Sequence, residues 1–170
     1  MLPRPSNFSP QGRLKVTVGS AIIPESAGLR YILQIVNDHG QHVGTFSKQI
    51  SKRWPAVETN YRQAYRLSNG QLKLGSVQFV QVQSDIIVVN MVAAHGSEED
   101  EDNVPPIRYD ALERCLDQVG QEIAYNRGSV HIPRFGVIDI SGSEWERVEP
   151  LLVNQLLKRG INVTVYDTKE

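Results

Sequence analysis

Residues Tyr109 to Tyr166 read YDALERCLDQVGQEIAYNRGSVHIPRFGVIDISGSEWERVEPLLVNQLLKRGINVTVY, and this stretch decides the fold. Its apolar residues recur at helical spacing from Tyr109 to Asn126, and a strand pattern follows from Ser129 to Ile132. A second helical pattern covers Trp145 to Arg159, and a second strand pattern covers Asn162 to Tyr166. The stretch therefore predicts a helix, a strand, a helix and a strand in that order.

This alternation predicts a parallel sheet covered by helices. Strands that are joined through helices pair in parallel by right-handed crossovers, which place helices on the faces of the sheet. We therefore expect an α/β protein with three layers, α/β/α. Ligands of such sheets bind beyond the carboxyl ends of the strands. The loops in that position run from Asn37 to Thr45 and from Pro133 to Ser143.

The first half of the chain predicts more strands and a pair of helices. Phe46 to Leu67 has helical periodicity, and Pro55 should divide it into two helices. A short polar link, Gln83 to Asp85, separates two apolar runs, which is typical of an antiparallel hairpin and makes the sheet mixed. The predicted strands are Leu14 to Val18, Leu29 to Val36, Val77 to Val82 and Ile86 to Ala93.

Length and composition are those of one globular domain. The chain has 170 residues, of which 40% are hydrophobic and 22% charged, so it can build a packed core. We expect a flexible N-terminal segment over residues 1–13 and a single domain over 14–170. The formal net charge of -1 creates no field that attracts nucleic acid or anionic membrane, so a bound anion must be held by local geometry.

The chain carries no pattern of a secreted or membrane protein. The polar, proline-rich N-terminus lacks an apolar signal stretch, and no apolar run approaches the roughly 20 residues that cross a bilayer. The lone Cys115 lies in a helical pattern and is expected to be buried rather than nucleophilic. We expect a reducing compartment, the cytoplasm, or the nucleus in a eukaryote. The acidic run Glu98 to Asp102 is interpreted as a solvated loop rather than a metal or partner site.

Four blocks of the chain, in order, resemble the macro domain family of ADP-ribose-binding modules. They are Val36 to Gly40, Val88 to Gly96, Val104 to Leu112, and Val130 to Gly136 with Trp145 behind it. The resemblance covers residues 14–167. Within the family the chain is similar to bacterial single-domain ADP-ribose-processing proteins, to terminal ADP-ribose protein glycohydrolase and to the macro domain of a chromatin remodeller.

The resemblance implies a set of ligand-binding residues. In the family, an Asn after a strand contacts the distal ribose, and glycines bring backbone amides to the diphosphate. Asn37 matches the first of these; its alternative interpretation is a residue that only turns the chain. Carried onto this sequence, the predicted ligand-binding residues are Ser20, Asn37, Gly40, Gly44, Phe46, Arg134, Gly136, Ser141 and Gly142.

The chain also departs from the family pattern. Most members have an Asp where Ser20 follows Gly19, and this Asp accepts a hydrogen bond from the adenine amino group. A neutral hydroxyl is a weaker acceptor than a carboxylate. In the second phosphate loop, Val137 and Ile138 stand where the family has glycines, and β-branched residues disfavour the backbone angles of a tight cradle.

Two residues are candidates for catalysis. Asp139 lies close to the position of the acidic residue of the glycohydrolases, and His42 stands where an aromatic residue is common. His42 either stacks or titrates near a ligand or is a surface-exposed loop histidine without a role. No lysine matches the nucleophile of those enzymes.

Other polar and aromatic residues have structural as well as functional interpretations. His95 either faces the ligand or caps the hairpin. Arg134 either meets a phosphate or pins its loop to a carboxylate such as Asp139, and we favour the second. Trp54 and Trp145 are expected in or near the core rather than stacked on a ligand.

The sequence thus predicts a macro domain that binds ADP-ribose or a derivative, free or attached to protein. The alternatives are an ADP-ribose-processing hydrolase, which removes ADP-ribose or a terminal phosphate, and a degenerate macro domain that no longer binds ADP-ribose. We expect no cofactor, no metal site, no nucleic-acid partner and no membrane contact. The oligomeric state is left open.

Overall fold

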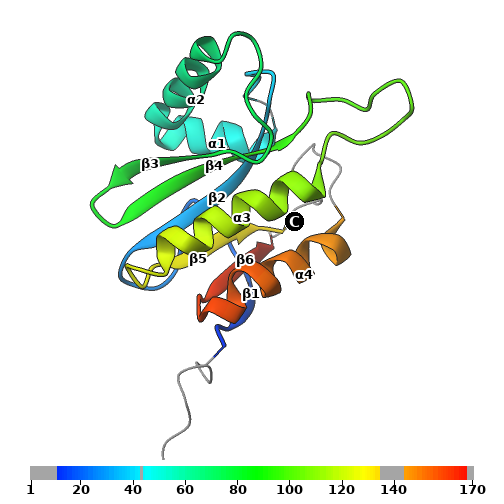
Figure 1. Ribbon diagram of the computed structural model, residues 1–170. Coiled ribbons are helices and arrows are strands. Elements are labelled where there is room, and N and C mark those ends of the chain that lie inside the picture. Colours follow the sequence, from blue (N-terminus) through cyan, green and yellow to red (C-terminus); the bar gives the residue numbers. More distant parts are fainter. Residues whose placement is uncertain (1–10, 43, 135–143, 168–170) are drawn as a thin grey trace, which may run out of the picture.

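A computed structural model describes residues 11–42, 44–134 and 144–167 (Figure 1). Within them, six strands form one mixed sheet in the order β1-β6-β5-β2-β4-β3. Each neighbouring pair is parallel except β3 and β4, which form the antiparallel hairpin that was predicted. The strands are β1 (Leu14–Val18), β2 (Arg30–Asn37), β3 (Val77–Gln83), β4 (Ile86–Ala94), β5 (Ser129–Pro133) and β6 (Val163–Asp167).

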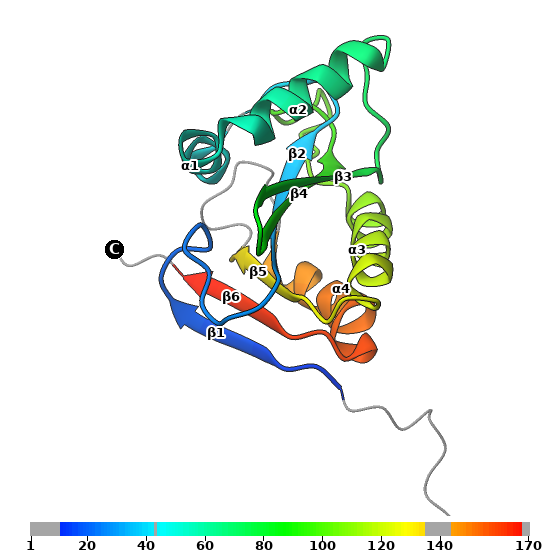
Figure 2. The ribbon, with the colours of Figure 1, turned by 90° about the vertical axis from the view of Figure 1, so that its left-hand side faces the viewer.

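Helices cover both faces of the sheet (Figure 2). Helices α1 (Thr45–Arg53) and α2 (Pro55–Leu67) lie on one face, and α3 (Tyr109–Ile123) and α4 (Trp145–Gln155) lie on the other. This arrangement confirms the predicted three-layer α/β/α fold with a mixed sheet. None of the helices in the described ranges has the length and apolar character needed to span a membrane.

The predicted elements agree with the observed ones to within a few residues. Pro55 separates α1 from α2, because its ring cannot continue a helix but fits the first helical position. The last predicted helix differs most. It ends at Gln155 and passes into a short 3₁₀ helix, η2 (Leu157–Arg159), which stops at Gly160 with a left-handed φ of 82°.

The larger core lies between the sheet and helices α3 and α4. Cys115 is fully buried there, as predicted, and burial raises the pKa of its thiol to about 12. Trp54 is buried under α1 and α2, and Trp145 packs partly buried against the larger core, as predicted.

Part of the predicted N-terminal segment 1–13 is anchored to the domain. Residues 1–10 lie outside the described residues. The amide of Gly12 donates to the carbonyl of Leu157, and the amide of Arg13 donates to the side chain of Asn162. These bonds hold the chain that leads into β1.

His131 is a buried polar residue on β5. Its Nε2 lies 2.8 Å from the Ser129 hydroxyl, and its Nδ1 lies 2.7 Å from the Tyr166 hydroxyl. That hydroxyl also accepts a hydrogen bond from the amide of Glu25, so Tyr166 links β5 to the segment after β1. Burial lowers the pKa of His131 to about 4, and the ring is neutral in the folded protein at neutral pH.

We predict that His131 makes folding depend on pH. Its pKa is lowered from 6.5 to about 4 on folding. The stability of the folded protein that depends on a neutral His131 is therefore complete above pH 6.5 and is lost as the pH falls toward 4. Wild type should lose about 2–3 kcal/mol more free energy of unfolding over that interval than His131→Gln does. Urea unfolding of both proteins at several pH values measures this. Parallel pH profiles would show that His131 has no such role.

Candidate functional site

The candidate site lies at the sheet edge where the parallel strands end. The loops that leave β1, β2, β4 and β5 start at this edge, as predicted. The second predicted ligand loop contributes Arg134 to the described residues. The four other predicted residues of that loop lie outside them: Gly136, Asp139, Ser141 and Gly142.

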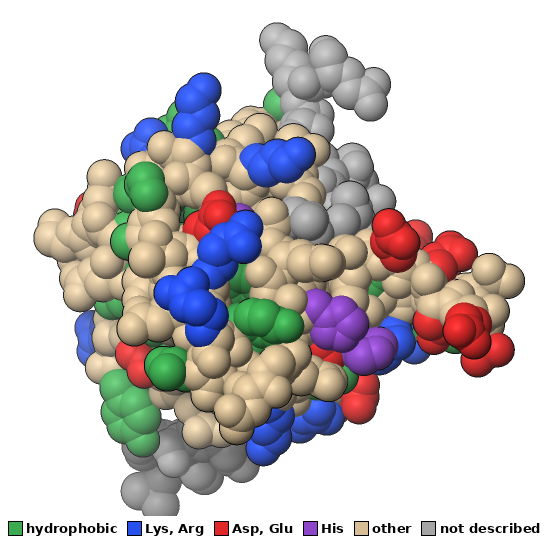
Figure 3. All heavy atoms as spheres, turned by 90° about the horizontal axis from the view of Figure 1, so that it is seen from above, with side chains coloured by type: hydrophobic (Ala, Val, Ile, Leu, Met, Phe, Trp, Pro, Cys, Tyr) green, Lys and Arg blue, Asp and Glu red, His purple; other side chains and the backbone are tan. Residues whose placement is uncertain are grey.

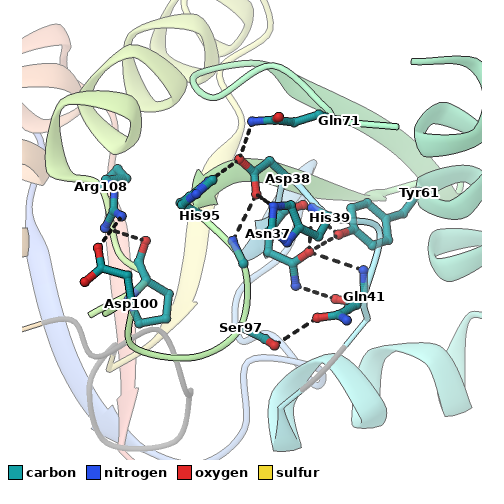
Figure 4. Close-up of polar contacts among 12 residues, drawn as sticks. Asn37, Asp38, His39, Gln41, Tyr61, Gln71, His95, Ser97, Asp100 and Arg108 are labelled. Carbon is teal, nitrogen blue, oxygen red and sulfur yellow. Dashed lines mark hydrogen bonds and ion pairs between the residues drawn. The ribbon is translucent and has the colours of Figure 1, made fainter. Parts of the chain in front are cut away.

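The side chain of Asn37 shapes the loop that follows β2. Its Oδ1 accepts hydrogen bonds from the amides of His39 (3.0 Å) and Gln41 (3.2 Å), and its Nδ2 donates to the Gln41 carbonyl (2.6 Å). The Tyr61 hydroxyl lies 2.6 Å from the carbonyl of Asn37 and 3.0 Å from its Oδ1 (Figure 4). Asn37 is 3% exposed, and it turns the chain. Its contact with a ribose stays a prediction.

Two glycines of this loop have left-handed backbones. Gly40 has a φ of 76°, and a Cβ there would collide with the ring of Tyr65. Gly44 has a φ of 100° and caps α1 without a side-chain hydrogen bond. The first-turn amides of a helix have no partner within the helix and carry partial positive charge. The loop therefore leads directly to a helix end suited to anions.

His42 corrects one of our interpretations, because it is not a surface-exposed loop histidine. Its side chain is only 1% exposed. Nδ1 lies 2.9 Å from the Ser51 hydroxyl and 3.4 Å from a carboxylate oxygen of Glu58, and Nε2 lies 3.4 Å from the side-chain nitrogen of Gln34. Burial, partly offset by Glu58, lowers the pKa of His42. The ring packs between β2 and the two helices.

A buried polar network extends from this histidine across the sheet. Gln34 donates to Asn90 on β4 (2.6 Å) and accepts from the Ser47 hydroxyl on α1 (2.8 Å). Phe46 packs beside it in the core and is 4% exposed. Gln34 and Asn90 are polar residues within otherwise apolar strands. Their presence in the sequence could have indicated that the loop histidine has a buried polar partner.

Ser20 follows β1, as the predicted adenine position requires. Its hydroxyl accepts a weak hydrogen bond from the amide of Ile22 (3.4 Å), and its carbonyl accepts from the amide of Ile23 (3.0 Å). The residue is half-buried in a turn. A contact with a base remains a prediction.

Arg134 pins its loop to a carboxylate, as predicted, and the partner is Asp167 at the end of β6; Asp139 lies outside the described residues. The guanidinium donates to both oxygens of Asp167, at 2.5 and 3.0 Å, and lies 5.3 Å from the centre of the Trp145 ring. The contact has a simple reason: β5 and β6 are neighbours and parallel, so their carboxyl ends meet. A bidentate pair of this kind fixes the position of the arginine.

Asp38 is a site residue that the sequence analysis missed. Its side chain is 0% exposed, and it accepts hydrogen bonds from the Gly96 amide (2.9 Å), His95 Nδ1 (2.8 Å) and Gln71 Nε2 (3.1 Å) (Figure 4). Although burial opposes ionisation, the bonds from His95 and Gly96 lower its pKa. His95 thus joins the loop after β4 to the loop after β2 and does not cap the hairpin.

Comparison with known proteins identifies the family. No protein-family model matches the chain, and neither does any curated protein. A solved structure of a protein of unknown function from Bacteroides thetaiotaomicron is 37% identical, covers 92% of this chain and 98% of its own, and has a TM-score of 0.86. The macrodomain protein from Streptomyces coelicolor is 38% identical, covers 91% of this chain and 99% of its own, and has a TM-score of 0.78. This chain belongs to the macro domain family.

More distant solved structures share the fold. One is Thermosipho africanus DarTG, solved in complex with ADP-ribose, which is 16% identical and has a TM-score of 0.68 over 91% of this chain and 41% of its own. In the present macro domain, the described part of the site consists of the turn after β1, the loop after β2 with the start of α1, and the segment after β4.

We predict that the Tyr61 hydroxyl stabilises the loop after β2. Tyr61→Phe leaves the buried carbonyl and Oδ1 of Asn37 without this donor, which should lower the free energy of unfolding by about 1–2 kcal/mol. Tyr125, which is 93% exposed, provides the control. Tyr125→Phe should change the free energy of unfolding by less than about 0.5 kcal/mol. Urea unfolding compares them. Equal stabilities of the two variants would contradict the role of Tyr61.

Proposed function

We propose that this macro domain binds ADP-ribose, or a derivative in which ADP-ribose is attached to protein, at the carboxyl edge of its sheet. One observation carries the proposal. The loop after β2 turns through two left-handed glycines, Gly40 and Gly44, into the N-terminus of α1, which has no side-chain cap and no acidic residue in its first turn. Unpartnered amides of a helix end suit a diphosphate.

The electrostatics of α1 support the same proposal. The helix, TFSKQISKR, contains three basic residues and no acidic one. Two of these, Lys52 and Arg53, lie in the last turn, so Lys48 is the basic residue nearer the N-terminus. Because the whole chain has a net charge of only -1, the helix end and Lys48 are the features that favour an anion here. The fold shared with Thermosipho africanus DarTG, which is solved with ADP-ribose, supports ADP-ribose as that anion.

The other candidate functions have less support. For hydrolysis, the nominated His42 is buried between β2 and the helices, and the nominated Asp139 lies outside the described residues. We therefore do not extend the proposal to a hydrolytic step. The degenerate macro domain is favoured only by the neutral Ser20 at the adenine position and by the altered second loop. Ligand titration separates it from the binding module.

Calorimetric titration of the full chain with ADP-ribose tests the proposal. We expect saturable heat with a dissociation constant on the order of micromolar, corresponding to about -8 kcal/mol. ADP and ribose 5-phosphate, titrated separately, should bind more weakly, because each offers only part of the ligand. Absence of heat with ADP-ribose at about 1 mM would overturn the proposal in favour of the degenerate macro domain.

We predict that Ser20→Asp strengthens the binding of ADP-ribose. The carboxylate is a charged acceptor for the adenine amino group, and a hydrogen bond to a charged group is roughly twice as strong as a neutral one. Aspartate also preserves the turn, since its side chain can accept the Ile22 amide as the serine hydroxyl does. Calorimetry should show a dissociation constant for ADP-ribose that is severalfold lower in the variant than in wild type.

The inosine analogue of ADP-ribose provides the control, because it lacks the amino group. It should gain nothing from Ser20→Asp. If the adenine and inosine ligands bind the variant equally well, the base does not contact residue 20.

A further inference from the structure

Three side chains of types that bind metal ions lie close together at the carboxyl edge of the sheet. Asp38 and His39 follow β2, and His95 follows β4 (Figure 4). Asp38 Oδ2 lies 2.8 Å from His95 Nδ1, and Asp38 Oδ1 lies 3.5 Å from His39 Nε2. All three donor atoms lie within 4.8 Å of one another. The sequence predicted no metal site, because Asp38 and His95 are 57 residues apart.

The carboxylate is held as a metal-binding carboxylate usually is. The Gly96 amide donates to Oδ1 and Gln71 Nε2 donates to Oδ2, so both oxygens are oriented by groups that are not metal ligands. Such outer hydrogen bonds fix the direction of a ligand. Each carboxylate oxygen has a second acceptor position, which an ion can take in place of the proton shared with His95.

The two imidazoles are accessible from solvent. Their side chains are 44% exposed for His39 and 43% for His95, and the ring centres are 5.1 Å apart. Figure 3 shows exposed histidine side chains on this face, beside an acidic projection. Among the described residues, Asp38 is the one polar side chain that either ring contacts by a hydrogen bond or ion pair. The rings can therefore rotate without losing other polar contacts.

We propose that Asp38, His39 and His95 bind a divalent transition-metal ion of the zinc type. Two imidazoles and one carboxylate suit Zn²⁺ and its neighbours, whereas Ca²⁺ and Mg²⁺ prefer ligands that are all oxygen. Ligand atoms at about 2.0 Å from a tetrahedral ion lie about 3.3 Å apart. Asp38 approaches His95 through Oδ2 at 2.8 Å and His39 through Oδ1 at 3.5 Å, so small side-chain rotations bring one carboxylate oxygen and both rings to one ion. Three protein ligands leave one position open to water or to an oxygen of a ligand.

The ion would connect the loops after β2 and β4. Asp38 and His39 belong to the loop that we propose for ADP-ribose, so the ion would lie at the same edge of the sheet. The assignment nevertheless rests only on the three side chains and their surroundings. Metal binding is tested without nucleotide. A negative result there leaves the ADP-ribose proposal intact, and a negative ADP-ribose titration leaves the metal proposal intact.

Titration of the chelator-treated full chain with ZnCl₂ in nucleotide-free buffer tests the site. Calorimetry should give one ion per chain, and His39→Ala and His95→Ala should each weaken binding by on the order of tenfold or more. His131→Gln is the matched control, because it removes a buried histidine away from the cluster and should leave zinc binding unchanged. With CoCl₂ as the probe, wild type should show a visible absorption band that both alanine variants lose.

Several results would overturn the proposal. They are the absence of zinc heat in wild type at about 1 mM, an unchanged zinc affinity in His39→Ala and His95→Ala, and a loss of binding in Glu98→Gln/Asp102→Asn, which would place the ion at the acidic run. Circular dichroism of each variant checks that it is folded.

Discussion

The buried carboxylate of Asp38 is the interaction on which the site depends. Parallel pairing of β2 with β4 runs from Arg30 opposite Ile86 to Asn37 opposite Ala94, with a register shift after Val36, and it brings the ends of both strands to one edge. There the Asp38 amide donates to the Ala94 carbonyl, and its side chain accepts from Gly96 and His95. Removing one partner of a buried charge is costly. These bonds therefore hold both loops in place and direct the chain toward α1.

The fold could be predicted from the sequence because its signals are local. Apolar periodicity, Pro55 and Gly160 mark where elements start and stop, and the alternation of helices and strands implies the parallel sheet. The site was predicted less completely. Asn37 and the two glycines lie in the loop after β2, as the strand pattern predicted, but the donor from Tyr61 comes from 24 residues away, and no local pattern reveals it.

The correction at His42 has the same physical origin. A surface-exposed loop histidine was one interpretation of His42, yet the side chains of Gln34 and Ser51 offer it a buried polar environment that appears only when α1 packs on β2. The pinning role of Arg134 followed from its chemistry, whereas its partner followed from strand order, which placed Asp167 beside it. Residue type predicted the interaction, and topology selected the partner.

The central claim is that ligand recognition occurs at the edge where the parallel strands end. A ¹⁵N–¹H NMR titration with ADP-ribose tests it most directly, because it reports which backbone amides respond. We expect the largest shifts at Ser20, at residues 38–44 and in the first turn of α1. Shifts concentrated at the opposite edge, around Arg127 and Asn162, would contradict it.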